Sequence, residues 1–185
     1  MTTTKPFLSD VQELRRRARE DMMRGSVTSD YKGDIKQAVA VLNAALATEI
    51  VCVLRYKRHY YMAKGIAKDS VAGEFLQHAN EEQGHADMIA ERITQLGGAP
   101  DFNPEGLATR SHSEYKEGSD LVDMIKENLV AERVAIESYR EMVHFFGDND
   151  PTTRRMLEEI LAVEEEHAND MVDLLEQHGS DGKQR

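Results

Sequence analysis

The chain has 185 residues, of which 31% are charged and 40% hydrophobic, and its formal net charge is -11. This length suits a single domain with a substantial core. The excess of 34 acidic over 23 basic side chains argues against a surface that grips nucleic-acid phosphates as a whole, because such a surface needs a net positive potential. Cys52 is the single cysteine, so no intrachain disulfide can form.

Neither a membrane span nor a secretory signal is evident in the sequence. We find no apolar run that approaches the roughly 20 residues needed to cross a bilayer. The N-terminal stretch MTTTKPFLSDVQELRRRARED lacks the apolar segment of a secretory signal. The sequence therefore predicts a cytoplasmic protein without a membrane partner, and the lone thiol is compatible with that compartment.

Residues 1–33 are predicted to form an N-terminal extension with a short amphipathic helix over about residues 9–24. Ser9 is the expected N-cap, Gln12 follows three residues later as in a capping box, and Gly25 ends the helix. The extension contains seven Lys or Arg and five Asp or Glu, a small positive excess that favours a solvated helix face over a DNA-binding arm. Its basic run comprises Arg15, Arg16, Arg17 and Arg19.

Four long helices are predicted to form one domain over residues 34–179, with a tail over residues 180–185. Glycine and proline separate them, and each would be roughly 40 Å long. Short connections make antiparallel hairpins of the first two and of the last two helices, whereas about 22 residues separate the hairpins and can run the height of a helix. This is the all-α, ferritin-like four-helix bundle. The helices cover about residues 35–64, 69–96, 120–146 and 150–178.

The two predicted hairpins resemble each other in sequence. The stretch EQGHADMIAERITQLGG in the second helix aligns with EEEHANDMVDLLEQHGS in the fourth at an offset of 82 residues, and ATEIVCVLRY in the first helix aligns with VAERVAIESY in the third at an offset of 83. Two such hairpins packed about a pseudo-twofold axis would bring equivalent residues together at the centre. The aligned pairs include Glu49 with Glu132, Glu82 with Glu164, His85 with His167 and Tyr56 with Tyr139.

A glutamate interrupts the apolar stripe of each helix near its middle. In the second and fourth helices a histidine follows three residues later, at a spacing that points both side chains to the same place. Four uncompensated carboxylates buried together would cost many kcal/mol, so the pattern requires a cation. Two divalent ions balance four carboxylates and leave two neutral imidazoles as ligands. The predicted metal ligands are Glu49, Glu82, His85, Glu132, Glu164 and His167.

This donor set is the di-iron carboxylate pattern: one Glu from each of two helices and a Glu-x-x-His from each of the others. Oxygen and imidazole donors without thiolate suit iron or manganese, with zinc as a competitor. Glu-x-x-His alone is a weak signal, because roughly one copy is expected by chance in such a chain. A third copy, Glu141 to His144, falls off the apolar stripe, and we interpret it as a surface pair. His59, His78, His112 and His178 are interpreted as surface or packing histidines.

The sequence around the predicted ligands resembles that of the bacterioferritins and the related bacterioferritin-like (Dps-like) miniferritins of the ferritin-like di-iron family. The motifs that carry the resemblance are LNAALATEIVCVLRY, EEQGHAD, LVAERVAIESY and LAVEEEHAND. The resemblance implies that Glu82 and Glu164 bridge two irons, whereas Glu49 and Glu132 are terminal ligands.

The resemblance covers about residues 35–178. It also implies which residues surround the metals and how the subunits assemble. Tyr56 occupies the place of a family tyrosine that lies near the irons, seven residues after the first glutamate. Bacterioferritins bind haem through a methionine directly after the glutamate of the second helix, where this chain has Gln83, so no haem is expected. The fifth helix of 24-subunit cages has no counterpart after His178, which favours a dodecamer. Many of the miniferritins carry a cysteine pair near the irons, whereas this chain has Cys52 alone.

The function that the resemblance implies is that of a ferroxidase with two iron ions per subunit. Such a protein oxidises Fe(II) with O2 or H2O2 and stores or detoxifies Fe(III) in a homo-oligomeric cage. One alternative keeps the same site in a di-iron or di-manganese peroxidase or catalase without storage. Another is a Dps-type shell that protects DNA.

Overall fold

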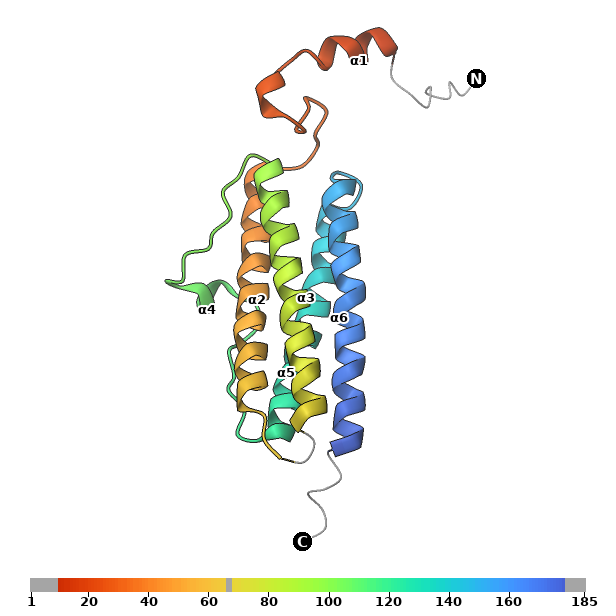
Figure 1. Ribbon diagram of the computed structural model, residues 1–185. Coiled ribbons are helices and arrows are strands. Elements are labelled where there is room, and N and C mark those ends of the chain that lie inside the picture. Colours follow the sequence, from red (N-terminus) through yellow and green to blue (C-terminus); the bar gives the residue numbers. More distant parts are fainter. Residues whose placement is uncertain (1–9, 66–67, 179–185) are drawn as a thin grey trace, which may run out of the picture.

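The computed structural model of the protein describes residues 10–65 and 68–178, and these residues form helices without any strand. Two helical hairpins make a four-helix bundle, and the N-terminal extension stands at one end of it (Figure 1). The predicted all-α architecture is confirmed. The helices are α1 (Val11–Arg17), α2 (Ile35–Met62), α3 (Lys68–Gln95), α4 (Leu107–Arg110), α5 (Leu121–Phe146) and α6 (Pro151–His178), with a 3-10 turn at Met22–Arg24.

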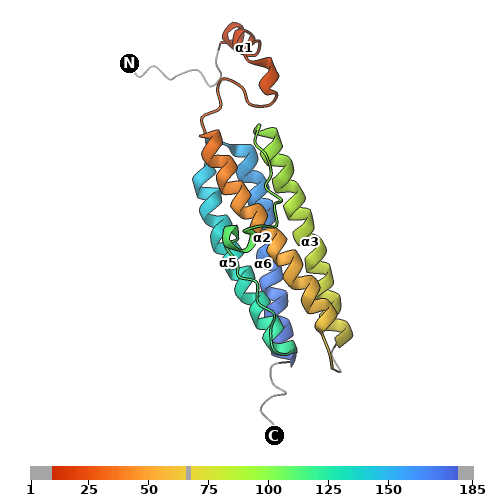
Figure 2. The ribbon, with the colours of Figure 1, turned by 90° about the vertical axis from the view of Figure 1, so that its left-hand side faces the viewer.

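The connections match the predicted topology. Helices α2 and α3 form one antiparallel hairpin, and α5 and α6 form the other, so that α3 and α5 run parallel. The chain leaves α3 at Gly97, whose φ of 79° lies in the left-handed region that favours glycine. The crossover then runs along α2 and α5 (Figure 2). It contains α4, which the sequence did not predict because four residues are too few for a periodic apolar pattern.

Aspartate side chains begin three of the bundle helices. The carboxylate of Asp34 accepts a hydrogen bond from the backbone N–H of Gln37 at 3.1 Å. Asp120 and Asp150 each accept one from the N–H three residues later at 2.9 Å. These caps satisfy N–H groups that have no partner inside the helix. The predicted helix ends lie within two residues of the observed ones.

The N-terminal helix is shorter than predicted, and the expectation of one helix over residues 9–24 was wrong. The predicted cap Ser9 lies outside the described residues, and the carboxylate of Asp10 accepts the N–H of Gln12 at 2.7 Å. The helix ends at Arg17, and Asp21 then adopts a left-handed φ of 47°. Helix α1 buries no residue, so no tertiary packing extends so short a helix.

Helix α2 contradicts the expectation that no segment is apolar enough to cross a membrane. It meets that criterion by length and composition, with a mean hydropathy of 1.8 in its most apolar window. Of that window, 56% is buried inside the bundle, and α2 also buries the charged side chains of Glu49 and Arg55. A core helix of a bundle passes the same test, so we attribute the apolar character of α2 to its place in the core.

Two apolar clusters fill the bundle, one toward each end. The first contains Leu46, Ile89 and Ile160, and the second contains Phe75, Ile125 and Met171. Along each of the four helices the glutamate that interrupts the apolar stripe falls between the two clusters. The core therefore holds a polar layer between two apolar ones.

Candidate metal centre

The polar layer brings together all six predicted ligands, which we call the carboxylate cluster. Each bundle helix contributes one glutamate, and α3 and α6 add a histidine one turn later. The four glutamates are no more than 1% exposed, and the two histidines are nearly as deeply buried. The cluster consists of Glu49, Glu82, His85, Glu132, Glu164 and His167.

Within the carboxylate cluster the ligand atoms fall into two groups of four. In one group Nδ1 of His85 lies 2.9 Å from Oε1 of Glu164, 3.2 Å from Oε2 of Glu82 and 3.4 Å from Oε2 of Glu49. In the other group Nδ1 of His167 lies 3.7 Å from oxygens of Glu82 and Glu164. Its distance to Oε2 of the fourth glutamate, on α5, is 4.0 Å. In each group the ligand atoms lie within 4.8 Å of one another, and Glu82 and Glu164 belong to both.

The fit to metal can be judged from the polar atoms that find no hydrogen bond. Buried polar atoms normally have a partner, and an orphaned one costs about 1–3 kcal/mol. Here several orphaned atoms face the same small space, which is the arrangement that cation coordination satisfies. They are Oε2 of Glu49, Oε1 of Glu82, Oε2 of Glu132, both carboxylate oxygens of Glu164 and Nδ1 of His167.

Glu49 and Glu132 each belong to only one of the two ligand groups. Burial and the neighbouring carboxylates raise the pKa of both. Burial raises the pKa of Glu49 to about 8, and the neighbouring Glu82 carboxylate adds to the rise. Burial and the carboxylates of Glu82 and Glu164 likewise raise the pKa of Glu132 well above its ordinary value. Without metal, both shifts favour the protonated, neutral form of these carboxyl groups.

The shared glutamates and the histidines shift in the opposite sense. Burial raises the pKa of Glu82, but the close imidazoles of His167 and His85 outweigh burial and hold that pKa below its ordinary value; the same balance acts on Glu164. Burial lowers the pKa of His167, but Glu164 and Glu82 outweigh it and raise that pKa to about 11, and the pKa of His85 is raised as well. Two imidazolium ions thus balance two carboxylates when no metal is bound.

A tyrosine hydroxyl bonds to each of the two glutamates that are not shared between the ligand groups. The hydroxyl of Tyr56 donates to Oε1 of Glu132, and the hydroxyl of Tyr139 donates to Oε1 of Glu49. In both cases the other carboxylate oxygen remains unpartnered and faces the cluster. Sequence reasoning singled out Tyr56 but missed the role of Tyr139, although the offset of 83 residues pairs the two.

Further polar side chains surround the cluster on the side of His167. Its Nε2 lies 2.8 Å from Oε2 of Glu81, and its ring stacks on that of His78 at a centroid distance of 3.9 Å. A carboxylate on the second imidazole nitrogen is a common support for a metal-bound histidine, because it fixes the tautomer. Sequence reasoning missed Glu81, because its side chain lies off the apolar stripe.

A buried cation, Arg55, lies behind Tyr56. Its guanidinium donates to Oδ1 of Asn128 at 3.0 Å, to Oγ of Ser113 at 3.1 Å and to Sγ of Cys52 at 3.4 Å. These bonds tie the crossover to the polar layer. Cys52 is itself buried, and burial raises the pKa of its thiol. No sequence pattern predicted this network.

Two other predicted features lie away from the carboxylate cluster. Gln83, at the position of the haem-binding methionine, is exposed on α3 and donates to Asp87 at 3.0 Å. Glu141 and His144 are both exposed, as expected of a surface pair.

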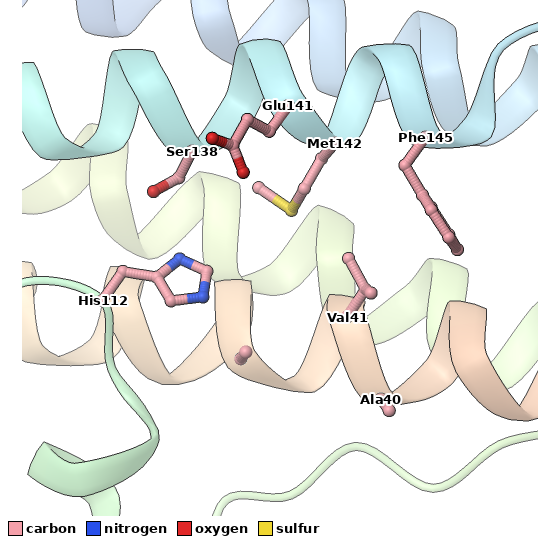
Figure 3. A pocket seen from close by; sticks show the side chains of 8 residues that line it. Ala40, Val41, His112, Ser138, Glu141, Met142 and Phe145 are labelled. Carbon is pink, nitrogen blue, oxygen red and sulfur yellow. The ribbon is translucent and has the colours of Figure 1, made fainter.

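A surface hollow of about 740 Å³ lies between α2, α5 and the crossover (Figure 3). His112 of the crossover and Ser138 and Glu141 of α5 line it, together with small apolar residues of α2. None of the six predicted ligands lines this hollow. The candidate metal centre is the buried carboxylate cluster, which lies away from this hollow.

The helical bundle agrees with the comparisons with known proteins. Residues 39–178 match the ferritin family through its ferritin-like domain, and the chain belongs to this family. The bacterioferritin of Rhodobacter capsulatus is 28% identical over 146 residues, which cover 78% of this chain and 83% of that protein. A nutrient stress-induced DNA-binding protein of Nostoc sp. is 31% identical over 134 residues, covering 69% and 71%.

A solved structure of a bacterioferritin-related protein has the same fold as this chain. The bacterioferritin-related protein from Bacteroides fragilis, described as a dodecameric thioferritin, superposes with a TM-score of 0.78 at 34% identity, covering 83% of this chain and 94% of that one. The resemblance to bacterioferritins and Dps-type proteins is confirmed.

Proposed function

We propose that this protein is a ferroxidase that oxidises Fe(II) with O2 or H2O2 and stores or detoxifies Fe(III) inside a homo-oligomeric cage. The observation that carries the proposal is the pair of four-ligand groups that share Glu82 and Glu164. Two Fe(II) ions in these groups would balance the four carboxylates. We assign the two substrate irons to Glu49, Glu82, His85, Glu132, Glu164 and His167.

The side chains divide into distinct tasks. Glu82 and Glu164 belong to both groups and would bridge the two ions, whereas Glu49 and Glu132 would each serve one ion through the oxygen that no tyrosine holds. Tyr56 fixes the orientation of the α5 carboxylate. Iron supplies the electrons for reduction of the oxidant, and the protein keeps the ligands in place in a buried layer that is poor in water.

Proton movement accompanies metal binding in this proposal. His85 and His167 carry protons in the metal-free cluster, because neighbouring carboxylates raise their pKa values. Each imidazole binds through Nδ1 only after it has lost that proton. Nε2 of His167 then keeps its proton and donates it to Glu81, which lies at the margin of the cluster.

We further propose a dodecameric cage in the cytoplasm, built from the predicted domain of residues 34–179, with residues 1–33 as its N-terminal extension; the predicted tail of residues 180–185 lies outside the described residues. The dodecameric Bacteroides fragilis relative supports this size. Twelve subunits of 20.9 kDa give a particle of about 250 kDa. Light scattering measures this mass, and a 24-subunit particle of about 500 kDa or a dimer would contradict the dodecamer.

The DNA-protecting alternative has weaker support, although the names of several relatives refer to DNA. In α1 the guanidinium of Arg16 pairs with Glu13 and Glu20, and that of Arg17 pairs with Asp30. These pairs reduce the positive charge that phosphates would meet. Deletion of residues 1–33 tests the arm by gel shift, and a loss of DNA retention would favour the alternative.

Oxidation kinetics test the main proposal. Fe(II) is loaded without oxygen and then exposed to air, and we expect about two rapidly oxidised irons per subunit. Glu82→Ala removes a ligand shared by both groups and should slow this phase about 100-fold or more. Glu141→Ala is the matched control, because it alters a Glu-x-x-His pair on the surface. Wild-type kinetics in Glu82→Ala would refute the assignment, and peroxide consumption without growth of a mineral would favour the peroxidase or catalase alternative.

A further inference from the structure

A second cluster of metal-binding side chains lies beside the carboxylate cluster, between α3 and α6. Nε2 of His78 lies 3.4 Å from Oδ2 of Asp170 and 3.9 Å from Oε1 of Glu74. One ligand atom from each residue lies within 4.8 Å of the others. None of these three residues belongs to the six ligands described above.

Nε2 of His78 is the observation that distinguishes this cluster from an ordinary acidic patch. His78 is fully buried, and its Nε2 has no hydrogen-bond partner. A buried nitrogen that points at two carboxylates without a bond needs either a proton or a metal ion between them.

The contact on the other side of the ring shows which nitrogen is left to face the carboxylates. The hydroxyl of Tyr56 donates its proton to Glu132, so its oxygen can only accept from His78. Nδ1 of His78, 3.1 Å from that oxygen, is therefore the protonated nitrogen. Nε2 is then the nitrogen that faces the oxygens of Glu74 and Asp170, where its lone pair can bind a cation. A cation satisfies all three groups at once.

The Glu74 carboxylate also shows an electrostatic strain that a cation would relieve. Burial raises the pKa of Glu74, and the charges of Asp170 and Glu81 add to the rise. No lysine or arginine pairs with Glu74 or Asp170 among the ion pairs of the described residues. The negative charge here is therefore held without a lysine or arginine counter-ion among the described residues.

We propose that Glu74, His78 and Asp170 bind a third divalent metal ion, and that Fe(II) lodges there on its way to the carboxylate cluster. The role as a way station rests on the proposed ferroxidase function, whereas the binding of a divalent ion does not. One imidazole and two carboxylates suit Fe(II), Mn(II), Co(II) and Zn(II).

The position of the site fits a step between solvent and the buried cluster. The side chains of Glu74 and Asp170 are 35% and 36% exposed, whereas the six ligands of the cluster are nearly inaccessible. The ring of His78 stacks directly on that of His167. Glu81, whose carboxylate contacts the far nitrogen of His167, lies on the same side. An ion held at Asp170 is thus separated from the cluster by the two stacked rings.

Cobalt binding tests the site without iron oxidation. Co(II) is titrated anaerobically into the protein and followed by calorimetry and by its visible absorption. We expect about three ions per subunit in the wild type and about two in Asp170→Asn, which preserves the shape of a partly exposed side chain. Asp173→Asn is the control, because it alters an exposed aspartate one turn further along α6 and should retain all three ions.

The outcomes separate this proposal from the ferroxidase proposal. Equal cobalt stoichiometry in wild type, Asp170→Asn and Glu74→Gln would overturn the third site, whatever Glu82→Ala does. Loss of one ion in both variants, with two retained, supports it. Glu82→Ala should lose the ions of the carboxylate cluster and keep the third. In iron oxidation, Asp170→Asn should slow uptake while still oxidising about two irons per subunit, and an unchanged rate would overturn the way-station role alone.

Discussion

Tyr56 and Tyr139 hold equivalent glutamates in the two halves of the bundle. Each hydroxyl donates to the inward glutamate of the facing helix, and the second oxygen of that glutamate is left for metal. This arrangement fixes the direction of a ligand before the ion arrives. The cost of ordering the ligand is then met during folding and not during binding.

We predict that Tyr139→Phe and Tyr56→Phe weaken metal binding by similar factors, about tenfold each. Loss of the hydroxyl frees Glu49 or Glu132 to rotate and removes a hydrogen bond from its carboxylate. Anaerobic Co(II) titration measures the effect. Tyr61→Phe is the control, because the ring of Tyr61 is 78% exposed. An effect confined to Tyr56→Phe would show that the two halves are not equivalent.

At the scale of single residues, the sequence predicted the ligands better than their supports. Glutamates on an apolar stripe are conspicuous, because burying them without compensation is costly. The pseudo-twofold alignment could also have identified Tyr139. Glu81 and His78 could not be predicted in the same way, because their roles depend on how α3 packs against α6. The sequence contains no direct record of such contacts across helices.

At the scale of the helices, a buried network ties the start of α6 to α3 and to the extension. Asp150 caps α6, and its carboxylate also accepts hydrogen bonds from two other elements. The guanidinium of Arg92 donates to its two oxygens at 3.0 and 3.1 Å, and the hydroxyl of Tyr31 donates at 2.9 Å. Arg92 also donates to Oγ1 of Thr153 at 2.7 Å. The cap is thus one part of a larger set of contacts between elements.

We predict that Asp150→Ala destabilises the protein by about 3 kcal/mol, because it removes the cap and leaves the buried guanidinium of Arg92 unpaired. The matched control is Asp120→Ala, which removes an exposed cap of α5 and should cost about 1 kcal/mol. Thermal unfolding at fixed metal concentration compares the two. Equal shifts in Tm would show that the Arg92 contact contributes nothing beyond capping.

The boundaries of the bundle helices were predictable from local sequence signals. Aspartate caps begin three of the bundle helices and long apolar periodicity marks all four, so sequence and structure differ by two residues or fewer. In the N-terminal extension these local signals did not predict the observed helix boundaries. Its helix has no buried face, and local capping by Asp10 set a start and a length that periodicity alone did not reveal.

At the scale of the whole molecule, part of the net charge of -11 belongs to the carboxylate cluster. The pKa shifts replace the missing metal charge with protons. Raised pKa values favour the neutral form of Glu49 and Glu132 and the charged form of His85 and His167. Binding of two divalent ions must displace these protons, about four per subunit. Metal affinity therefore increases as the pH rises.

The same shifts determine how stability depends on pH. A group with a raised pKa binds more protons in the folded chain than in the unfolded one, so its contribution to stability is present at low pH and is lost as the pH rises. For Glu49 this loss occurs between its ordinary pKa and about 8, and for His167 between its ordinary pKa and about 11. The opposite shifts of Glu82 and Glu164 act at acidic pH, below the ordinary value for glutamate.

We predict that the Tm of the metal-free protein falls as the pH rises from about 6 to about 8, whereas the stabilisation by Co(II) grows over the same interval. Scanning calorimetry with chelator and with Co(II) measures both trends, and Glu82→Ala should abolish most of the cobalt effect. A cobalt stabilisation that stays constant from about pH 6 to about pH 8 would contradict the proton exchange. In that case the protons assigned to the two imidazoles and two carboxyl groups would not be the ones that metal replaces, and the charge balance of the core would need another counter-ion.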